Sequence, residues 1–493
     1  MTKPLFAPYW TALLGLVIAL GVANVVAIAP TAASSTDNPA RVCDSDARNG
    51  GPATPPEGAV VVPAGNNANV DFARANTTYW FATGVHTLGS SEWGQIAPAD
   101  NSTFIGAPGA ILDGENVNRY AFTQRARDVT IKYLTIRNFV APRDEGVVNH
   151  DSGNGWTIAH STLTLNKGAA MMAGAGQQMI GNCLKDNGQY GLNAYQAGNK
   201  ITNLVLEGNE FVGNNTDDWE SRVDGCGCTG AMKFWSVDGA DIRDNWIHDN
   251  RGPGIWADTN NNDFLIENNL IESNDGQAVF YEISYNAVIR DNVLRDNTWV
   301  AGREFANRRD NFPIGTIYVS EAGGDPRVPA RTTLLEITGN VFDNNWGGVA
   351  GWENADRFCG TNTTSECTLL VGEDNESKCV QPGIASEPLY SDCRWKTQRL
   401  RVHHNEFKID TAEVGCSTAY CGLNALFANH GTWPDWSPYK GRKIQEAITF
   451  AQDNRWHDNT YIGPWRWVAY EPGRYLTFAQ WQADPYNQDA GSS

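Results

Sequence analysis

The segments "IRDNWIHDN" at residues 242–250 and "IENNLIESN" at residues 266–274 follow one pattern. In each, an apolar residue is followed three positions later by Asn, five positions later by a second apolar residue and eight positions later by a second Asn. Self-similarity with a period of roughly 20 to 50 residues is typical of solenoids and related repeat architectures. The recurrence of this pattern along the chain therefore decides the fold class.

The pattern occurs nine times. Ser161 replaces the first Asn in one unit, and Asp410 replaces the second Asn in another. The units begin 21 to 65 residues apart, which fits one coil of a solenoid with insertions of variable length. The first apolar residues of the units are Ile158, Met179, Leu206, Ile242, Ile266, Ile289, Ile337, Val402 and Ala451.

Within a unit, apolar residues alternate with polar ones, and Asn or Gly interrupts every few residues. This predicts short strands joined by turns and leaves no room for a helix. Asn tolerates the left-handed backbone of a turn, and its amide can bond to the Asn of the coils above and below. We therefore expect an all-β, single-stranded right-handed parallel β-helix (a β-solenoid) of about ten coils with loop insertions.

The segment "STFIGAPGAILDG" at residues 102–114, followed by "VTIKYLTIRNF" at residues 129–139, resembles the opening coils of pectate-lyase-like right-handed parallel β-helix proteins. The later Asn-containing units are similar to the repeats of that class, and the resemblance covers roughly residues 60–470. The class includes polysaccharide lyases, glycoside hydrolases, epimerases and proteins without an assigned role. The resemblance therefore implies the fold and leaves the reaction open.

The chain divides into four parts by composition. Residues 1–33 are expected to be a signal peptide, because Lys3 precedes an apolar run and small residues follow at 31–33; an uncleaved anchor is the alternative. Residues 34–57 are a flexible lead, 58–475 the β-helix and 476–493 a C-terminal tail. We expect loops at 298–313 and 323–332, and a long excursion at about 354–396 that carries four cysteines.

Charge and cysteine content limit the partners. With 37 basic and 56 acidic residues the net charge is −19, which disfavours nucleic acid as a partner. The ten cysteines favour disulfides over zinc and indicate export, so we expect a secreted or extracellular protein, or a surface-anchored one if the signal segment is retained. We expect a monomer with no membrane segment beyond the first one.

A further strand follows the second Asn of each unit, and four of these can be compared: "GLNAY" (191–195), "AMKFW" (231–235), "GIWAD" (254–258) and "AVFYE" (278–282). Alternation directs one set of side chains to the core, and the others then form two outward columns. The inward set is Leu192, Met232, Ile255 and Val279, continued by Ala194, Phe234, Ala257 and Tyr281. The columns are Asn193, Lys233, Trp256 and Phe280, and Tyr195, Trp235, Asp258 and Glu282.

Aromatic side chains beside acids on one outward face predict a carbohydrate-binding groove; the alternative is that a loop such as 298–313 covers them. Asp258 and Glu282 lie on adjacent coils, so one carboxyl should hold a proton near neutral pH. This division into acid and base is what glycoside hydrolysis requires, and no cofactor is needed. Sugar contacts are expected at Trp256, Trp235, Tyr195, Asn193 and Phe280.

Two other functions stay open. A polysaccharide lyase or epimerase acting on a uronate polymer would use Lys233 as base, with Ca²⁺ bound by Asp217, Asp218 and Glu220. A non-catalytic carbohydrate-binding surface protein would need neither a catalytic base nor Ca²⁺. The same three acids also fit a merely solvated acidic loop, and pairing with Lys233 is an alternative role for the acids of the groove. Because a polyuronate is repelled by a chain of charge −19, the sequence favours a glycoside hydrolase acting on a polysaccharide.

Overall fold

The computed structural model describes residues 41–43, 45, 50–223, 227–361 and 366–493. The expected signal segment at 1–33 and half of the lead at 34–57 lie outside the described residues. Among the residues that are described, no helix combines the length and the apolar character needed to cross a membrane.

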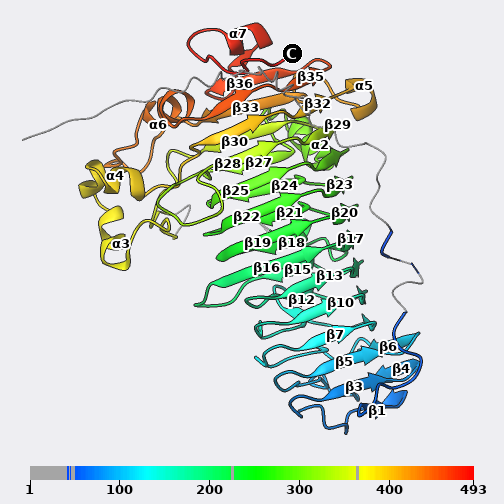
Figure 1. The fold of residues 1–493 in the computed structure, drawn as a ribbon. Coiled ribbons are helices and arrows are strands. Elements are labelled where there is room, and N and C mark those ends of the chain that lie inside the picture. Colours follow the sequence, from blue (N-terminus) through cyan, green and yellow to red (C-terminus); the bar gives the residue numbers. More distant parts are fainter. Residues whose placement is uncertain (1–40, 44, 46–49, 224–226, 362–365) are drawn as a thin grey trace, which may run out of the picture. The chain divides into compact units, whose positions relative to one another are not determined.

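The fold is built from three long sheets whose strands stack coil upon coil (Figure 1). The first sheet has thirteen parallel strands. They are β1 (Val60–Val62), β3 (Thr78–Phe81), β5 (Thr103–Gly106), β7 (Thr130–Lys132), β10 (Thr157–Ala159), β13 (Gln178–Ile180), β16 (Ile201–Glu207), β19 (Val237–Arg243), β22 (Asn262–Glu267), β25 (Tyr285–Arg290), β28 (Leu335–Thr338), β31 (Leu400–His403) and β34 (Arg455–His457).

The second sheet also has thirteen parallel strands, each of which follows a strand of the first sheet along the chain. They are β2 (Gly65–Asn66), β4 (Gly84–Thr87), β6 (Ala110–Asp113), β8 (Thr135–Arg137), β11 (Thr162–Thr164), β14 (Cys183–Lys185), β17 (Glu210–Val212), β20 (Trp246–His248), β23 (Leu270–Glu272), β26 (Val293–Arg295), β29 (Val341–Asp343), β32 (Glu406–Lys408) and β35 (Thr460–Ile462).

The third sheet has eleven strands, and only the pairing of its last two strands is antiparallel. They are β9 (Gly146–Val148), β12 (Ala169–Met172), β15 (Tyr190–Ala194), β18 (Gly230–Phe234), β21 (Ile255–Ala257), β24 (Val279–Glu282), β27 (Ile317–Ser320), β30 (Val349–Glu353), β33 (Leu423–Ala428), β36 (Arg466–Tyr470) and β37 (Tyr475–Leu476). The parallel β-helix expected from the sequence is confirmed.

The β-helix has more coils than the approximately ten that the sequence predicted. Five strands of the first sheet run from β1 to β10, yet the repeat pattern first appears in β10, at Ile158. The earlier coils stack in the same way, with Phe104 opposite Ile131 and Ile131 opposite Ile158. Their turns lack the two Asn residues, so a count of Asn units misses them.

Two ladders of buried asparagines run along the turns at either end of the second sheet. In each ladder the side-chain amide of one Asn donates to the amide oxygen of the Asn in the next coil, over 2.9–3.1 Å. The first ladder is Asn182, Asn209, Asn245, Asn269, Asn292, Asn340, Asn405 and Asn459; the second is Asn166, Asn187, Asn214, Asn250, Asn274, Asn297 and Asn345.

The ninth repeat unit is shifted by one strand from its predicted alignment. Ala451 was aligned with Val402, but it lies at the end of helix η3 (Ala447–Ala451), and Val402 pairs with Trp456 instead. The amide of Asn405 accordingly bonds to Asn459. Asn and apolar residues recur every five positions here, so the sequence pattern fits either alignment.

Helices occupy two segments that were expected to be irregular. In the segment 298–313, helix α2 (Trp299–Asn307) packs on the solenoid through Gly302, where a Cβ would lie 2.2 Å from the Trp346 ring. In the expected tail, helix α7 (Phe478–Gln482) buries Trp481, whose indole donates to Asp489 at 2.7 Å. Residues 476–493 are therefore a cap on the last coil, which a solenoid needs to cover its end.

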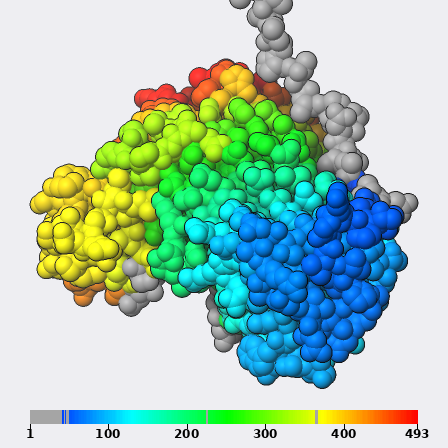
Figure 2. All heavy atoms as spheres, turned by 60° about the horizontal axis from the view of Figure 1, so that its bottom comes forward, coloured from blue at the N-terminus to red at the C-terminus, as the bar shows by residue number. Residues whose placement is uncertain are grey.

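The excursion between β30 and β31 carries helices α3 (Glu373–Cys379), η2 (Pro382–Ala385) and α4 (Leu389–Asp392) and projects to one side (yellow in Figures 1 and 2). Three other short helices are α1 (Trp219–Arg222), α5 (Thr411–Val414) and α6 (Lys443–Glu446). Among the described residues, disulfides join Cys43 to Cys183, Cys359 to Cys367, Cys379 to Cys393 and Cys416 to Cys421. The described residues include no free cysteine, as expected.

Replacing Asn269 by Ala tests the ladder. Its buried amide donates to Ile242 O and Asn292 Oδ1, both at 2.9 Å, and its oxygen accepts from Asn245. We expect a loss of about 1–3 kcal/mol in the free energy of unfolding, because partners in two coils are left unsatisfied. Chemical denaturation measures it, with the exposed Asn199→Ala as control. Equal stability of the two variants would contradict the ladder's role.

Candidate functional site

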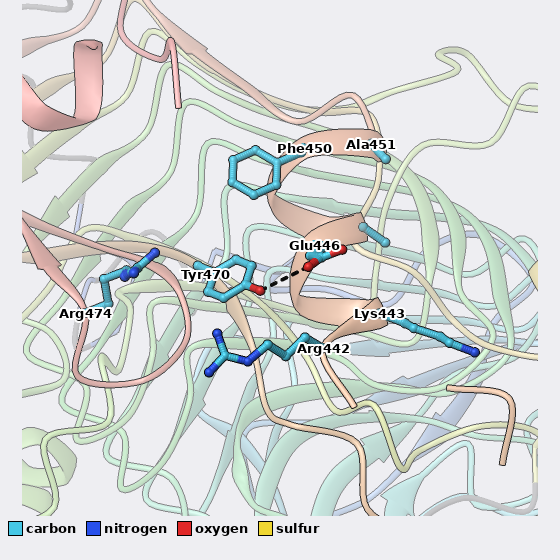
Figure 3. Close-up of a pocket in the computed structure, with 8 residues that line it drawn as sticks. Arg442, Lys443, Glu446, Phe450, Ala451, Tyr470 and Arg474 are labelled. Atoms are coloured by element: carbon cyan, nitrogen blue, oxygen red, sulfur yellow. Dashed lines mark hydrogen bonds between the residues drawn. The ribbon is translucent and has the colours of Figure 1, made fainter. Parts of the chain in front are cut away.

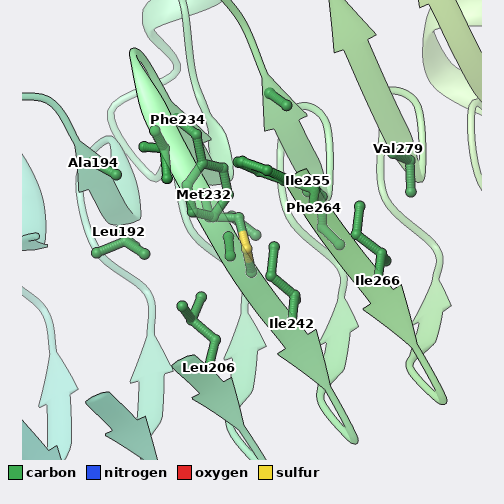
Figure 4. Packing of buried hydrophobic residues seen from close by; sticks show 14 of the residues in the cluster. Leu192, Ala194, Leu206, Met232, Phe234, Ile242, Ile255, Phe264, Ile266 and Val279 are labelled. Atoms are coloured by element: carbon green, nitrogen blue, oxygen red, sulfur yellow. The ribbon is translucent and has the colours of Figure 1, made fainter. Parts of the chain in front are cut away.

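The inward side chains of the third sheet lie as predicted. Leu192, Met232, Ile255 and Val279 are fully buried, and Figure 4 shows them packed between the sheets. The strand register places Asn193 beside Lys233, Lys233 beside Trp256, and Trp256 beside Phe280. The two outward columns therefore exist on the outer face of this sheet.

The first column is tightly packed around Trp256. The Lys233 ammonium lies 4.0 Å from the centroid of the indole, and Phe280 stacks on Trp256 with a centroid distance of 5.1 Å and an interplanar angle of 11°. Trp256 is only 7% exposed. Lys233 and Phe280 cover the two faces of the indole, so a sugar can stack on Trp256 only if Lys233 moves. Without that movement, Trp256 packs against Lys233 and Phe280 and contacts no sugar.

Asp258 is held by two donors. Its Oδ2 forms an ion pair with Lys233 Nζ at 2.9 Å, and its Oδ1 accepts a hydrogen bond from Thr259 Oγ1 at 2.9 Å. The side chains of Asp258 and Lys233 are both about nine-tenths buried. The pairing with Lys233 that the sequence left open is thus present, and it fixes the orientation of the Asp258 carboxylate.

Glu282, on the next coil, has different surroundings. Its Oε2 accepts a hydrogen bond from Trp256 Nε1 at 3.2 Å, and its Oε1 lies 2.6 Å from Arg357 Nη1. Burial, reinforced by the negative charge of Asp258 and opposed by Arg357, raises the pKa of Glu282 from 4.5 to about 7. One carboxyl of the pair therefore holds a proton near neutral pH, as its position beside Asp258 predicts.

Arg357 and Glu321 belong to the site but were not predicted from the sequence. Arg357 also contacts Glu321, at 3.2 Å, and Glu321 is completely buried and accepts hydrogen bonds from Ser320 Oγ and Asn354 N. Burial raises the pKa of Glu321. Arg357 begins the excursion, 75 residues beyond Glu282, so no repeat pattern could point to it. Glu321 could have been noticed because it directly follows the strand next to Glu282.

The second column is open at one end and covered at the other. Tyr195 is 44% exposed and Trp235 is partly exposed, and their rings meet edge to face with centroids 6.3 Å apart. Farther along the sheet, Phe312 packs against Trp352 and Phe427 at 5.6 and 5.4 Å. A segment of 298–313 thus covers the C-terminal part of the face, and the part around Trp235 remains accessible.

A pocket of about 500 Å³ lies beside the columns. Trp256 and Phe280 are part of its wall, together with helix α2 and the acidic loop before β18. Its charged lining residues are Asp218, Glu220, Arg251, Asp275 and Glu304. The pocket is therefore predominantly acidic. Its wall residue Trp256 donates a hydrogen bond to Glu282, but neither Asp258 nor Glu282 lines the pocket.

The acids proposed as Ca²⁺ ligands have separate partners. Asp217 pairs with Lys167, and Asp218 accepts a hydrogen bond from Ser221 at 2.7 Å. Glu220 accepts hydrogen bonds from the backbone of residues 227 and 229 and from the hydroxyl of residue 229. Among the described residues these carboxylates do not form a group with mutually close ligand atoms. The Ca²⁺ site stays a prediction without a preformed ligand set.

Asn193, predicted to contact sugar, is 7% exposed and donates to the backbone oxygen of Asp144 at 3.2 Å. Tyr190, on the same strand, is buried near the charges of Asp144, Asp258 and Glu220. Burial, with a contribution from these acids, raises the pKa of the phenol well above its ordinary value.

A second hollow of about 620 Å³ lies at β36, four strands beyond β24 in the third sheet, against helices α6 and η3 (Figure 3). The Tyr470 hydroxyl donates to Glu446 at 3.3 Å at its centre, and Arg442 and Arg474 flank the ring of Tyr470. None of the predicted site residues lines this hollow, which is therefore separate from the site around Asp258.

Comparison with known proteins supports the fold. The family model described as "Right handed beta helix region" matches residues 145–328. Together with the parallel sheets, this match confirms the right-handed parallel β-helix and, at the level of the fold, the resemblance to pectate-lyase-like proteins. Among curated protein sequences, none matches this chain.

Three solved structures illustrate the range of similar proteins. The A-module of a mannuronan C-5 epimerase from Azotobacter vinelandii is 14% identical, with a TM-score of 0.40 over 71% of this chain and 83% of that chain. The catalytic domain of a GH87 alpha-1,3-glucanase in complex with tetrasaccharides is 10% identical, with a TM-score of 0.41 over 90% and 70%. A Streptococcus pneumoniae surface protein and adhesin is 12% identical, with a TM-score of 0.36 over 62% and 94%. These likenesses are too distant to assign a reaction to this chain.

The raised pKa of Glu282 predicts a pH-dependent stability. A carboxyl that binds its proton more tightly in the folded state than in the unfolded state stabilises the fold fully below about pH 4.5, and this contribution is lost as the pH rises through about 7. Compared with Glu282→Gln, the wild type should therefore lose stability between about pH 5 and about pH 8. Thermal unfolding at both pH values measures this difference. A difference that does not change with pH would show that Glu282 has an ordinary pKa.

Proposed function

We propose that the protein is a carbohydrate-active enzyme, a glycoside hydrolase that cleaves a polysaccharide on the outer face of the third sheet. One observation carries the proposal: Asp258 and Glu282 are neighbouring carboxyls on adjacent coils with contrasting surroundings. Asp258 is paired with a cation at 2.9 Å, and Glu282 is buried with a pKa of about 7. Pairs of titratable groups whose surroundings separate their pKa values are typical of acid and base partners.

The surroundings of the two carboxyls indicate which one is the acid and which one is the nucleophile or base. Glu282 retains its proton near neutral pH and acts as the general acid that protonates the leaving glycosidic oxygen. Asp258, oriented by Lys233 and Thr259, acts as the nucleophile or as the base that activates water. Trp256 and Arg357 position Glu282 through its two oxygens and do not need to touch the sugar.

The substrate class follows from charge and exposed aromatic area. Acidic side chains outnumber basic ones in the pocket lining, and the whole chain carries a net charge of −19, so a neutral or weakly charged polysaccharide is favoured over a polyuronate. The exposed ring of Tyr195 and the partly exposed ring of Trp235 lie in the same column as Asp258 and are available for stacking of sugar rings. The disulfides support our proposal that the protein acts outside the cytoplasm.

A lyase or epimerase reaction is the alternative, because Lys233 lies in the same site and can serve as a base. Its ammonium is 2.9 Å from Asp258, so this reaction first requires Lys233 to release a proton while it is paired with a carboxylate. That requirement favours hydrolysis. A non-catalytic carbohydrate-binding protein would show no turnover, so replacing either carboxyl would change no activity.

Asp258→Asn and Glu282→Gln test the acid–base pair. Each keeps the shape of the side chain and removes its charge, so we expect turnover to fall by about 10²–10⁴-fold while the fold is retained. The assay incubates cell-wall and plant polysaccharides with the protein and reads out reducing-end release and the absorbance of unsaturated products. Glu267→Gln, on the first sheet, is the matched control.

Each outcome of that assay has a distinct meaning. Reducing ends without unsaturated products, lost in both carboxamide variants, support hydrolysis. Unsaturated products that disappear in Lys233→Ala indicate a lyase. Full activity in both carboxamide variants contradicts the proposed site.

The two tryptophans should respond differently. Trp235→Ala removes a partly exposed stacking surface that acts equally in the ground and transition states, so KM should rise with little change in kcat. Trp256→Ala removes the hydrogen bond to Glu282 and the packing of Lys233, so kcat should fall. Steady-state kinetics on the substrate found above separates the two effects. A rise in KM alone for Trp256→Ala would instead support direct sugar contact.

A further inference from the structure

Three histidines lie together on the last two coils, away from the proposed carbohydrate site. His403 ends β31 and pairs in register with His457, which ends β34, and His404 follows His403 directly. These positions lie at the turn between the first and second sheets, whereas Asp258 and Glu282 lie on the outer face of the third. The proposed hydrolysis makes no use of them.

The imidazoles are close enough to share a ligand. His403 Nδ1 and His404 Nδ1 are 2.8 Å apart, and the rings of His403 and His457 are stacked with centroids 4.7 Å apart and an interplanar angle of 4°. Each of the three residues offers a ring nitrogen, and these nitrogens all lie within 4.8 Å of one another. Three imidazole nitrogens at such spacing match the ligand set of a first-row transition metal.

Carboxylates orient two of the three rings. Glu336 Oε1 lies 3.0 Å from His403 Nε2, and Asp458 Oδ2 lies 2.8 Å from His457 Nδ1. A carboxylate that accepts the N–H of one ring nitrogen fixes the tautomer and leaves the lone pair on the other nitrogen, which is Nδ1 in His403 and Nε2 in His457. This is the usual support of a metal-binding histidine. The hydroxyl of Thr338, 3.1 Å from His403 Nδ1, is a further polar contact of the cluster.

The electrostatics of the cluster also favour a cation. Glu336 and Asp458 bring negative charge next to the rings. His404 is exposed and the side chain of His457 is 36% exposed, so the cluster is accessible from solvent.

His404 is not required by the turn. It adopts a left-handed backbone with φ of 55°, at the position held in other coils by Gly208, Asp244 and Asn268. Gly, Asn and Asp adopt this conformation most readily, and an imidazole adds nothing to the ladder hydrogen bonds. His160 occupies the same turn position between β10 and β11, so the evidence for a binding role of His404 is its place beside His403 and His457.

We propose that His403, His404 and His457 form a surface binding site for a divalent transition metal of the zinc or copper type. Three imidazole nitrogens bind the ion, and its remaining coordination position is open to solvent. Glu336 and Asp458 hold the rings in place from the second layer. Hard cations such as Ca²⁺, which prefer oxygen ligands, do not fit this set.

The test is calorimetric titration of the tag-free, disulfide-intact chain, stripped with chelator, with Zn²⁺ alone and separately with Ca²⁺. We expect saturable binding of one Zn²⁺ per chain and no binding of Ca²⁺ at this site. His404→Ala and His457→Ala should each weaken Zn²⁺ binding by more than about tenfold, and Glu336→Gln by about 10–100-fold. His430→Ala, an exposed histidine outside the cluster, is the matched control and should bind like the wild type.

Two outcomes would overturn the proposal: the absence of saturable Zn²⁺ binding to the wild type, or wild-type affinity in both His404→Ala and His457→Ala. Thermal unfolding of the metal-free variants shows that they are folded, so lost binding can be assigned to the lost ligand. With Cu²⁺ as probe, electron paramagnetic resonance should show nitrogen couplings that change in His457→Ala and persist in His430→Ala. Identical spectra for all variants would also contradict the site.

Discussion

The hydrogen bond between asparagines of successive coils is the constraint on which the structure depends. The amide of Asn269 donates to Asn292 and accepts from Asn245, so one residue type satisfies the turn of its own coil and fixes the register of the next. A solenoid has mainly nearest-neighbour contacts, and a slip of one residue would turn every side chain to the opposite face. Because the ladder prevents that slip, positions far apart in the sequence remain aligned in columns.

The candidate site is a consequence of this alignment. Lys233, Trp256 and Phe280 are separated by 23 and 24 residues in the sequence but occupy successive strands of one sheet. The solenoid thus brings single outward residues from several coils together without a dedicated loop. The cost is that each column residue must pack against its neighbours in the column, which explains why Trp256 is enclosed by Lys233 and Phe280.

The sequence was informative wherever period and alternation determine position. It predicted the fold, the inward set and both columns, including the raised pKa of a carboxyl in the Asp258–Glu282 pair. It failed where tertiary contacts decide. Helix α2 forms in an expected loop because Gly302 fits against Trp346, and Arg357 reaches Glu282 from an excursion that no repeat describes. The alignment of Ala451 failed for the opposite reason, because a five-residue periodicity fits two registers equally well.

The charges around Glu282 explain why its proton is retained. Asp258, Glu282 and Glu321 are three buried carboxyls, and within the part of the chain that the structure describes only the two cations Lys233 and Arg357 pair with them. A fully ionised group would carry one uncompensated negative charge, and burial of such a charge is strongly unfavourable. Retaining one proton removes the excess. Lys233 is paired with Asp258, and Arg357 is divided between Glu282 and Glu321, so the proton is held on the Arg357 side. Because the described residues pair only two cations with these three carboxyls, Glu282 stays protonated beside the Asp258 carboxylate. This follows from the composition of the site and requires no movement of the coils.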